Sequence, residues 1–214
     1  MKEYKVMDNV YLFNSYVDAI DLSFNQFLVL TPIPMLIHTG AIDRTEVLIP
    51  KIQEVIGSSP LEYVFISHFE SDECGGLALL KNYYPQIKAI CSQITARQLM
   101  GFGITSNIAV VNPQDKMKIG DSLFEFISYP SEMHLWEGLI MVEANQGILY
   151  SSDLFIRTGT IQKSMENSAI NEEIQNINLH KVPSQEALER LKRDLSALHL
   201  NYLMPGHGPC LKLF

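Results

Sequence analysis

The sequence predicts a single mixed domain of the α/β or α+β class. Short apolar runs alternate along the chain with longer stretches whose apolar residues recur at helical spacing. A length of 214 residues suits one domain with a substantial core, and 47% hydrophobic with 19% charged residues is the composition of an ordinary folded protein. Because no repeat, low-complexity segment or linker divides the sequence, we expect one domain over residues 1–214.

The N-terminal half is expected to alternate strands with helices. Helices are expected over residues 44–56, which carry an apolar stripe, over 77–83 after a glycine pair, and over 93–100 with Ser92 as N-cap. Apolar runs that stop at polar or turn-forming residues predict strands over 10–13, 26–30, 35–37, 63–66, 87–91 and 108–111.

The C-terminal half repeats this order. Strands are expected over residues 123–128, 138–143, 147–152 and 200–204, with a hairpin turn before the third of them. Ser184 is suited to cap the last helix, whose leucines recur at helical spacing. The polar region over residues 155–178 is expected to be partly helical from residue 166. It either covers the functional site or simply connects two elements.

The stretch over residues 66–76 carries the chemistry. It follows a buried strand, and a loop there can turn the alternate side chains His68, Glu70 and Asp72 toward one point. An imidazole and two carboxylates that converge suit a divalent or redox-active metal ion. The alternative is a polar loop that caps a helix, with Asp72 or Glu73 facing the positive end of the helix dipole.

Three further side chains strengthen the metal hypothesis. His134, Asp153 and His207 each follow a predicted strand, which is where rigid scaffolds usually present functional groups. His207 lies in a Pro-Gly-His-Gly-Pro turn over residues 205–209. Several independent strand ends that carry His or Asp are not expected by chance.

These motifs together resemble the metallo-β-lactamase superfamily. The pattern His-x-Glu-x-Asp at residues 68–72 is followed in order by His134, Asp153 and the Gly-His-Gly of residues 206–208. Glu70 stands where the hydrolases of the superfamily have histidine, and this feature is similar to the flavodiiron branch. Residues 36–40 and 72–76 resemble in particular its stand-alone oxygen-binding di-iron domains, which have no flavodoxin module. The resemblance implies a four-layer αββα sandwich.

The resemblance also implies a dinuclear metal centre. One metal ion would take His68, Glu70 and His134 as ligands, and the other would take Asp72 and His207. Imidazole accepts iron, zinc and manganese alike, whereas the added carboxylates shift the preference toward iron and manganese. We therefore expect two iron ions, with zinc or manganese as alternatives.

Other residues near this centre have several interpretations. The resemblance implies that Asp153 bridges the two ions. Glu73 departs from the flavodiiron pattern, which commonly has histidine there, and could bind the second ion, relay protons or favour a helix N-terminus. His38 is expected to be a hydrogen-bond partner of a ligand rather than a ligand. Trp136 either walls the pocket or belongs to the core.

The resulting functional hypothesis is a non-haem di-iron protein that binds or reduces dioxygen, peroxide or nitric oxide. Full flavodiiron enzymes supply electrons from FMN in a C-terminal domain. This chain ends at residue 214, soon after His207, so we expect no FMN and a separate electron-transfer partner. An oxygen sensor or carrier is an equal alternative to a reductase.

A dinuclear zinc hydrolase of an ester, thioester, lactone or phosphodiester is the alternative from another class. Metal-bound hydroxide would attack the substrate, and the turn around His207 is common among such hydrolases. Glu70 argues against this hypothesis. A metal-stabilised interaction module without catalysis is a third hypothesis.

Composition restricts the partners and the compartment. A formal net charge of −8 without a basic stripe argues against nucleic-acid binding. Residues 1–5 are followed by no apolar secretory region, and no apolar run is long enough to span a membrane. Three cysteines without a Cys-x-x-Cys pair indicate reduced thiols, so we expect a cytoplasmic protein. The sequence leaves a homo-oligomer open.

Overall fold

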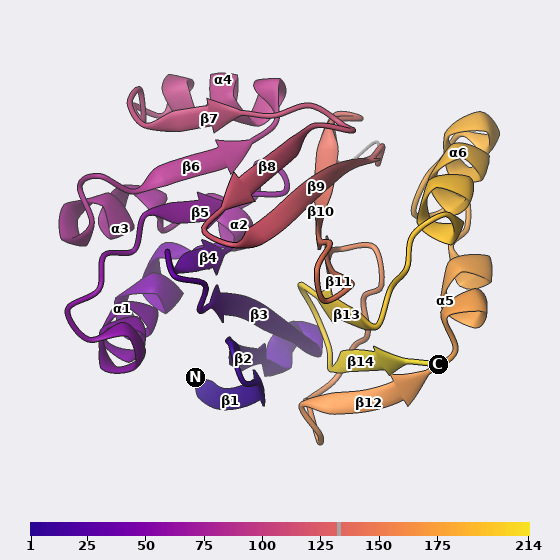
Figure 1. The fold of residues 1–214 in the computed structure, drawn as a ribbon, viewed down its shortest axis with the longest axis horizontal. Helices are drawn as coiled ribbons and strands as arrows, with labels where there is room; N and C mark the ends of the chain where they lie inside the picture. The colour runs from indigo at the N-terminus through magenta and orange to yellow at the C-terminus, as the bar shows by residue number, and fades with distance from the viewer. Residues whose placement is uncertain (132–133) are drawn as a thin grey trace.

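Two mixed β-sheets pack face to face, and helices cover the outer face of each. This is the arrangement of the computed structural model, which describes residues 1–131 and 134–214 (Figure 1). The four layers are helices, sheet, sheet and helices, as the αββα prediction requires. Within the described residues, no helix is both long and apolar enough to span a bilayer.

The first sheet comes from the N-terminal half and keeps its strands in chain order. Neighbouring strands are antiparallel from the first to the fourth and parallel from the fourth to the seventh. Its strands are β1 (Lys2–Met7), β2 (Val10–Val17), β3 (Leu22–Val29), β4 (Met35–Ile37), β5 (Tyr63–Phe65), β6 (Lys88–Cys91) and β7 (Ile108–Val110).

The second sheet comes from the C-terminal half and has the order β12-β14-β13-β11-β10-β9-β8. Its central strands are antiparallel except for the parallel pair β11 and β13. Its strands are β8 (Lys116–Ile119), β9 (Ser122–Tyr129), β10 (Gly138–Glu143), β11 (Ile148–Ser152), β12 (Met165–Ser168), β13 (Tyr202–Pro205) and β14 (Cys210–Leu213).

The helices divide between the two outer layers. The first sheet is covered by α1 (Ile42–Ile56), α3 (Leu77–Tyr83) and α4 (Gln93–Gly101), and the second by α5 (Ile170–Asn176) and α6 (Gln185–Ser196) (Figure 1). The side chain of Ser92 caps α4 and that of Ser184 caps α6, as predicted. The part of the chain that the structure describes also has two short elements, the 3-10 turn η1 (Asp18–Ile20) and α2 (Ser71–Cys74).

Three buried apolar clusters hold the layers together. The middle cluster joins the sheets and includes Phe27 and Phe65 from the first and Phe126 and Tyr150 from the second. A second cluster packs α1, α3 and α4 on the first sheet, and a third packs α5 and α6 on the second. Removing this apolar surface from water stabilises the stack by roughly 25 cal/mol per Å² of buried area.

Most sequence predictions of buried elements are confirmed, but several edge strands were missed. β1 has no buried residue, and β12 contains polar residues that resemble a loop or helix. The expectation of partly helical structure from residue 166 is therefore wrong for β12 and right for α5. β12 forms because its backbone pairs in parallel with β14, a long-range contact that local sequence does not specify.

Candidate metal centre

The predicted ligands gather where strands of both sheets end. His68 follows β5, Asp153 follows β11, and His207 follows β13. The intervening α2 is a single helical turn, not the plain loop expected from the sequence, and it carries Asp72 and Glu73. With His134, which lies between β9 and β10, these positions come from four different connections, yet their side chains form two adjacent groups.

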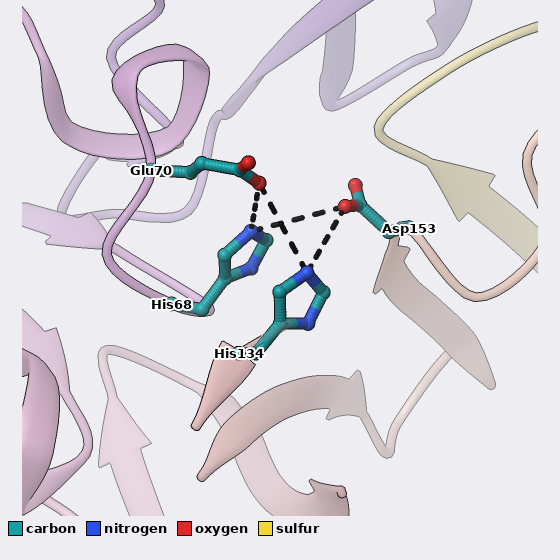
Figure 2. A group of neighbouring side chains, drawn as sticks. All are labelled: His68, Glu70, His134 and Asp153. Carbon is teal, nitrogen blue, oxygen red and sulfur yellow. Dashed lines mark hydrogen bonds and ion pairs between the residues drawn. The ribbon is translucent and has the colours of Figure 1, made fainter. Parts of the chain in front are cut away.

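The first group contains two stacked imidazoles between two carboxylates (Figure 2). The rings of His68 and His134 lie 3.6 Å apart between centroids with an interplanar angle of 18°. Nε2 of His68 is 3.0 Å from Glu70 Oε2, and Nε2 of His134 is 3.3 Å from Asp153 Oδ2. All four side chains thus direct one ligand atom toward a common point.

The second group contains Asp72, Glu73 and His207. Nε2 of His207 is 3.5 Å from Asp72 Oδ2. Glu73 is 1% exposed, and its Oε2 lies 3.4 Å from Nε2 of His68 in the first group. The two groups are therefore in direct contact and form one polar centre within the protein.

Asp153 faces both groups with different oxygens. Its Oδ2 faces His134 at 3.3 Å and His68 at 3.8 Å, while its Oδ1 is 3.1 Å from Nε2 of His207. Ser152, which precedes it, has a positive φ of 49°. This left-handed conformation is uncommon for a residue with a side chain, and it ends β11 at the point where Asp153 turns into the centre.

Opposing electrostatic effects act on these carboxylates. Burial alone would raise the pKa of Asp153, but hydrogen bonds from His134 and His207 hold it well below its usual value. For Glu73, burial and the charges of Asp153 and Asp72 raise the pKa well above its usual value. Burial also raises the pKa of Asp72. These effects disfavour the ionised form of Glu73 in the absence of a bound cation.

The donor set fits two divalent cations. Three imidazoles and four carboxylates offer nitrogen and oxygen ligands, and Glu73 is almost fully buried without a hydrogen-bond partner for Oε2 among residues 1–131 and 134–214. A buried carboxylate without a partner is costly unless a cation balances it. Two cations of charge +2 would match four carboxylates, which supports a dinuclear metal centre.

Two serines that the sequence analysis did not single out support His68 from behind. Oγ of Ser67 is 2.9 Å from Nδ1 of His68 and 2.8 Å from Oγ of Ser152. With Nδ1 donating to Ser67, Nε2 of His68 keeps a free lone pair toward the centre. Both serines immediately precede predicted ligands in the sequence, and this position is the feature from which their role could have been predicted.

His38 and Trp136 lie beside the centre in different settings. His38 is buried, with Nδ1 3.9 Å from Oε1 of Glu73, a distance too long for a hydrogen bond. Burial lowers the pKa of His38 to about 3, so the ring is neutral. Trp136 is 44% exposed, which makes the core alternative wrong, and it lines a cleft of about 230 Å³ with Gln93 and Leu139.

Among the described residues, Ser71 lines two pockets, one beside Asp72 and the other beside Glu70. The smaller, of about 170 Å³, is lined by Phe24, Arg44 and Asp72 among others. The larger, of about 380 Å³, is mainly apolar and extends from Glu70 to Phe102. Glu70 is also the most accessible of the predicted carboxylate ligands, with a side chain 47% exposed against 19% for Asp72. Each pocket therefore borders the centre at one predicted carboxylate ligand.

Comparison with known proteins identifies the family. A family model described as ODP family beta lactamase matches residues 22–208. The chain belongs to this family. A curated relative of this ODP family chain, the putative diflavin flavoprotein A 2 of Thermosynechococcus vestitus, is 27% identical over 135 residues, which are 61% of this chain and 23% of the relative.

Solved structures with the same fold include a flavoprotein and an oxygen oxidoreductase. The ODP family chain matches a flavoprotein of Thermotoga maritima with a TM-score of 0.83 at 19% identity, covering 99% of this chain and 57% of that one. Rubredoxin oxygen:oxidoreductase of Desulfovibrio gigas gives 0.76 at 18% identity, with 99% and 57% covered. These matches confirm the sandwich of the metallo-β-lactamase type. The chain spans less than a quarter of the curated relative and little over half of these two structures.

Proposed function

We propose that this protein is a non-haem di-iron protein that binds or reduces dioxygen, with peroxide and nitric oxide as further small substrates. The observation that carries the proposal is the pair of adjacent ligand groups joined by Asp153. Four carboxylates to three imidazoles favour iron or manganese over zinc, because hard oxygen ligands suit those ions.

His68, Glu70 and His134 would hold one iron, and Asp72, Glu73 and His207 the other. Asp153 would contact both, since its two oxygens face the two groups. We include Glu73 as a ligand because its side chain is buried from solvent and its Oε2 lies 3.4 Å from Nε2 of His68. Bound iron would supply the one-electron redox chemistry that the reaction needs.

The chain's other residues would control access to the centre. Phe24 packs edge-on against the His207 ring, with centroids 5.0 Å apart, and shields this ligand from water. The apolar pocket beside Glu70 is wide enough for a diatomic molecule and offers few polar groups to compete for it. This environment suits a small apolar substrate better than an ester or phosphodiester.

The names of related proteins support the redox proposal. Solved structures that share this fold include a flavo di-iron protein of Thermotoga maritima and the rubredoxin oxygen:oxidoreductase of Desulfovibrio gigas. By analogy, a separate electron-transfer protein would re-reduce this chain if it acts as a reductase. An oxygen sensor would need no such partner in each binding cycle.

Metal analysis after anaerobic, iron-replete expression tests the proposal. We expect close to two irons per chain, together with a spectral change when the reduced protein meets dioxygen. Stoichiometric zinc that persists in active protein, without any iron-dependent function, would contradict the proposal and favour the dinuclear hydrolase. Zinc acquired during aerobic overexpression has less weight, because zinc generally binds more tightly than ferrous iron.

A further inference from the structure

A short neighbouring strand leaves part of β3 free at one edge. β2 pairs with β3 along its whole length, from Leu22 to Val29. On the other side β4 pairs only with residues 27–29, so no strand among residues 1–131 and 134–214 lies beside the edge over residues 22–25. Unpaired backbone groups at such an edge need other hydrogen-bond partners when they are buried.

The loop that carries His207 occupies this edge, although it belongs to the second sheet. The backbone N–H of Asn25 donates to the carbonyl of Gly206 at 2.8 Å, and that of Gly208 donates to Oγ of Ser23 at 3.1 Å. Nδ1 of His207 donates to the carbonyl of Ser23 at 2.8 Å. The first sheet thus orients His207, a predicted ligand that lies on a loop of the second sheet.

The side chain of Asn25 closes around the same loop. Its Nδ2 lies 2.8 Å from the carbonyl of Pro205 and 2.8 Å from that of Gly208, the residues on either side of Gly206 and His207. Its Oδ1 accepts from Nδ2 of Asn14 at 2.8 Å. Asn25 is 2% exposed, so water cannot replace these bonds.

The chemistry of this position demands an amide. Two carbonyl oxygens within 2.8 Å require two N–H donors on one atom, and the remaining oxygen must accept. Aspartate has nearly the same shape but would direct a carboxylate oxygen at two carbonyls. Serine or alanine would leave the carbonyls without partners in a buried site.

We propose that Asn25 is a positioning residue for the metal ion of the second group, acting through the loop and through His207. With Nδ1 bound to Ser23, Nε2 of His207 is the atom that faces Asp153 at 3.1 Å and Asp72 at 3.5 Å. The inference rests on metal binding by the proposed centre, but not on iron or on dioxygen chemistry.

Cobalt(II) titration of the metal-free 214-residue chain tests the inference. Wild type should bind two cobalt ions, whereas Asn25→Asp should keep one tight site and lose at least roughly 10-fold in affinity at the other, the typical effect of removing a residue that orients a ligand. The cobalt(II) ion that stays tightly bound should show the absorption spectrum of the site around His68.

Asn201→Asp is the matched control. Asn201 lies just before β13 of the second sheet, and its Nδ2 donates to the carbonyl of Gln146 in the turn between β10 and β11 at 2.9 Å, outside the centre. This variant also directs a carboxylate oxygen at a backbone carbonyl, and it should still bind two cobalt ions. If Asn25→Asp binds both ions with wild-type affinity while its melting temperature falls, Asn25 has only a structural role and the inference is overturned.

Nuclear magnetic resonance of ¹⁵N-histidine in the wild-type protein gives a second test, which requires no variant to fold. His207 should be the Nδ1–H tautomer with the proton retained after zinc is added, and an Nε2–H tautomer would overturn the inference. A wild-type chain that binds neither cobalt nor zinc would contradict both the metal centre and this inference. Two bound ions without dioxygen reactivity would contradict the proposed function alone.

Discussion

The carboxylate of Glu73 lies 3.4 Å from the imidazole of His68, and both side chains are almost fully buried. The sequence alone is compatible with Glu73 as a ligand, a proton relay or a charge at a helix N-terminus. Its position between the two ligand groups favours metal ligation. A negative charge on Glu73 is shielded from water and lies beside two further carboxylates, so a bound cation would stabilise it.

Replacing the two glutamates separately should distinguish their contributions. Glu70→Ala removes an anion of the first group and should reduce bound metal from two ions toward one. Glu73→Gln should reduce it to a similar extent if Glu73 is a ligand of the second group. Mass-spectrometric metal analysis of the folded variants provides the measurement, with Glu54→Ala on the exposed face of α1 as control. Full metal content in Glu73→Gln would show that Glu73 is not a ligand.

Glu73 should also make the metal-free protein less stable as the pH rises. Its folded-state pKa is raised above the ordinary value of 4.5, so ionisation opposes folding. The penalty is absent below pH 4.5, grows as the pH rises toward the folded-state pKa, and is complete above it.

Metal-free Glu73→Gln should therefore melt at a higher temperature than metal-free wild type at pH 8, and the difference should disappear at low pH. About 1 kcal/mol corresponds to a shift of roughly 2–4 °C in a domain of this size. Calorimetry over a range of pH measures it, with the exposed Glu46→Gln as control. A variant that is less stable than wild type at every pH would refute the explanation.

The hydroxyl of Ser67 should affect the first ligand group selectively. Ser67→Ala removes the partner 2.9 Å from Nδ1 of His68 and leaves the ring free to change tautomer. We expect the affinity of the first group for cobalt(II) to fall roughly 10-fold with the second group unaffected. Ser196→Ala, which removes a hydroxyl bonded to a backbone carbonyl on α6, is the control. If the first group binds cobalt(II) with the same affinity in Ser67→Ala and in Ser196→Ala, Ser67 does not orient His68.

The buried strands could be predicted from the sequence because their apolar runs are long and bounded by turns. β5 and β11 are examples, and each delivers a residue of the centre at the predicted place. β1 and β12 could not be predicted, since exposed or polar edge strands depend on pairing with a distant partner.

The same distinction applies to the centre. His68, Glu70 and Asp72 lie in one local motif, so their approach to each other could be predicted. Asn25 and His207 are separated by most of the chain, and no local pattern marks an asparagine on β3 as a partner of a loop after β13. That contact depends on how the two sheets stack, which emerges only in the folded structure.

The supply of electrons leads to the last prediction. Two ferrous ions hold two electrons, and reduction of dioxygen consumes two electrons to give hydrogen peroxide or four to give water. The reduced 214-residue chain, mixed with dioxygen without a donor, should therefore consume one dioxygen per chain if peroxide forms, or one per two chains if water forms, and then stop. An oxygen electrode and a peroxide assay measure both quantities.

A reductase should resume turnover when a rubredoxin-like or flavin donor and its reductase are added. A sensor should instead hold dioxygen reversibly and show no response to the donor. If the iron-loaded, reduced protein shows no spectral change with dioxygen, peroxide or nitric oxide, the redox proposal is wrong, and zinc- or manganese-loaded protein should then be screened for hydrolase activity.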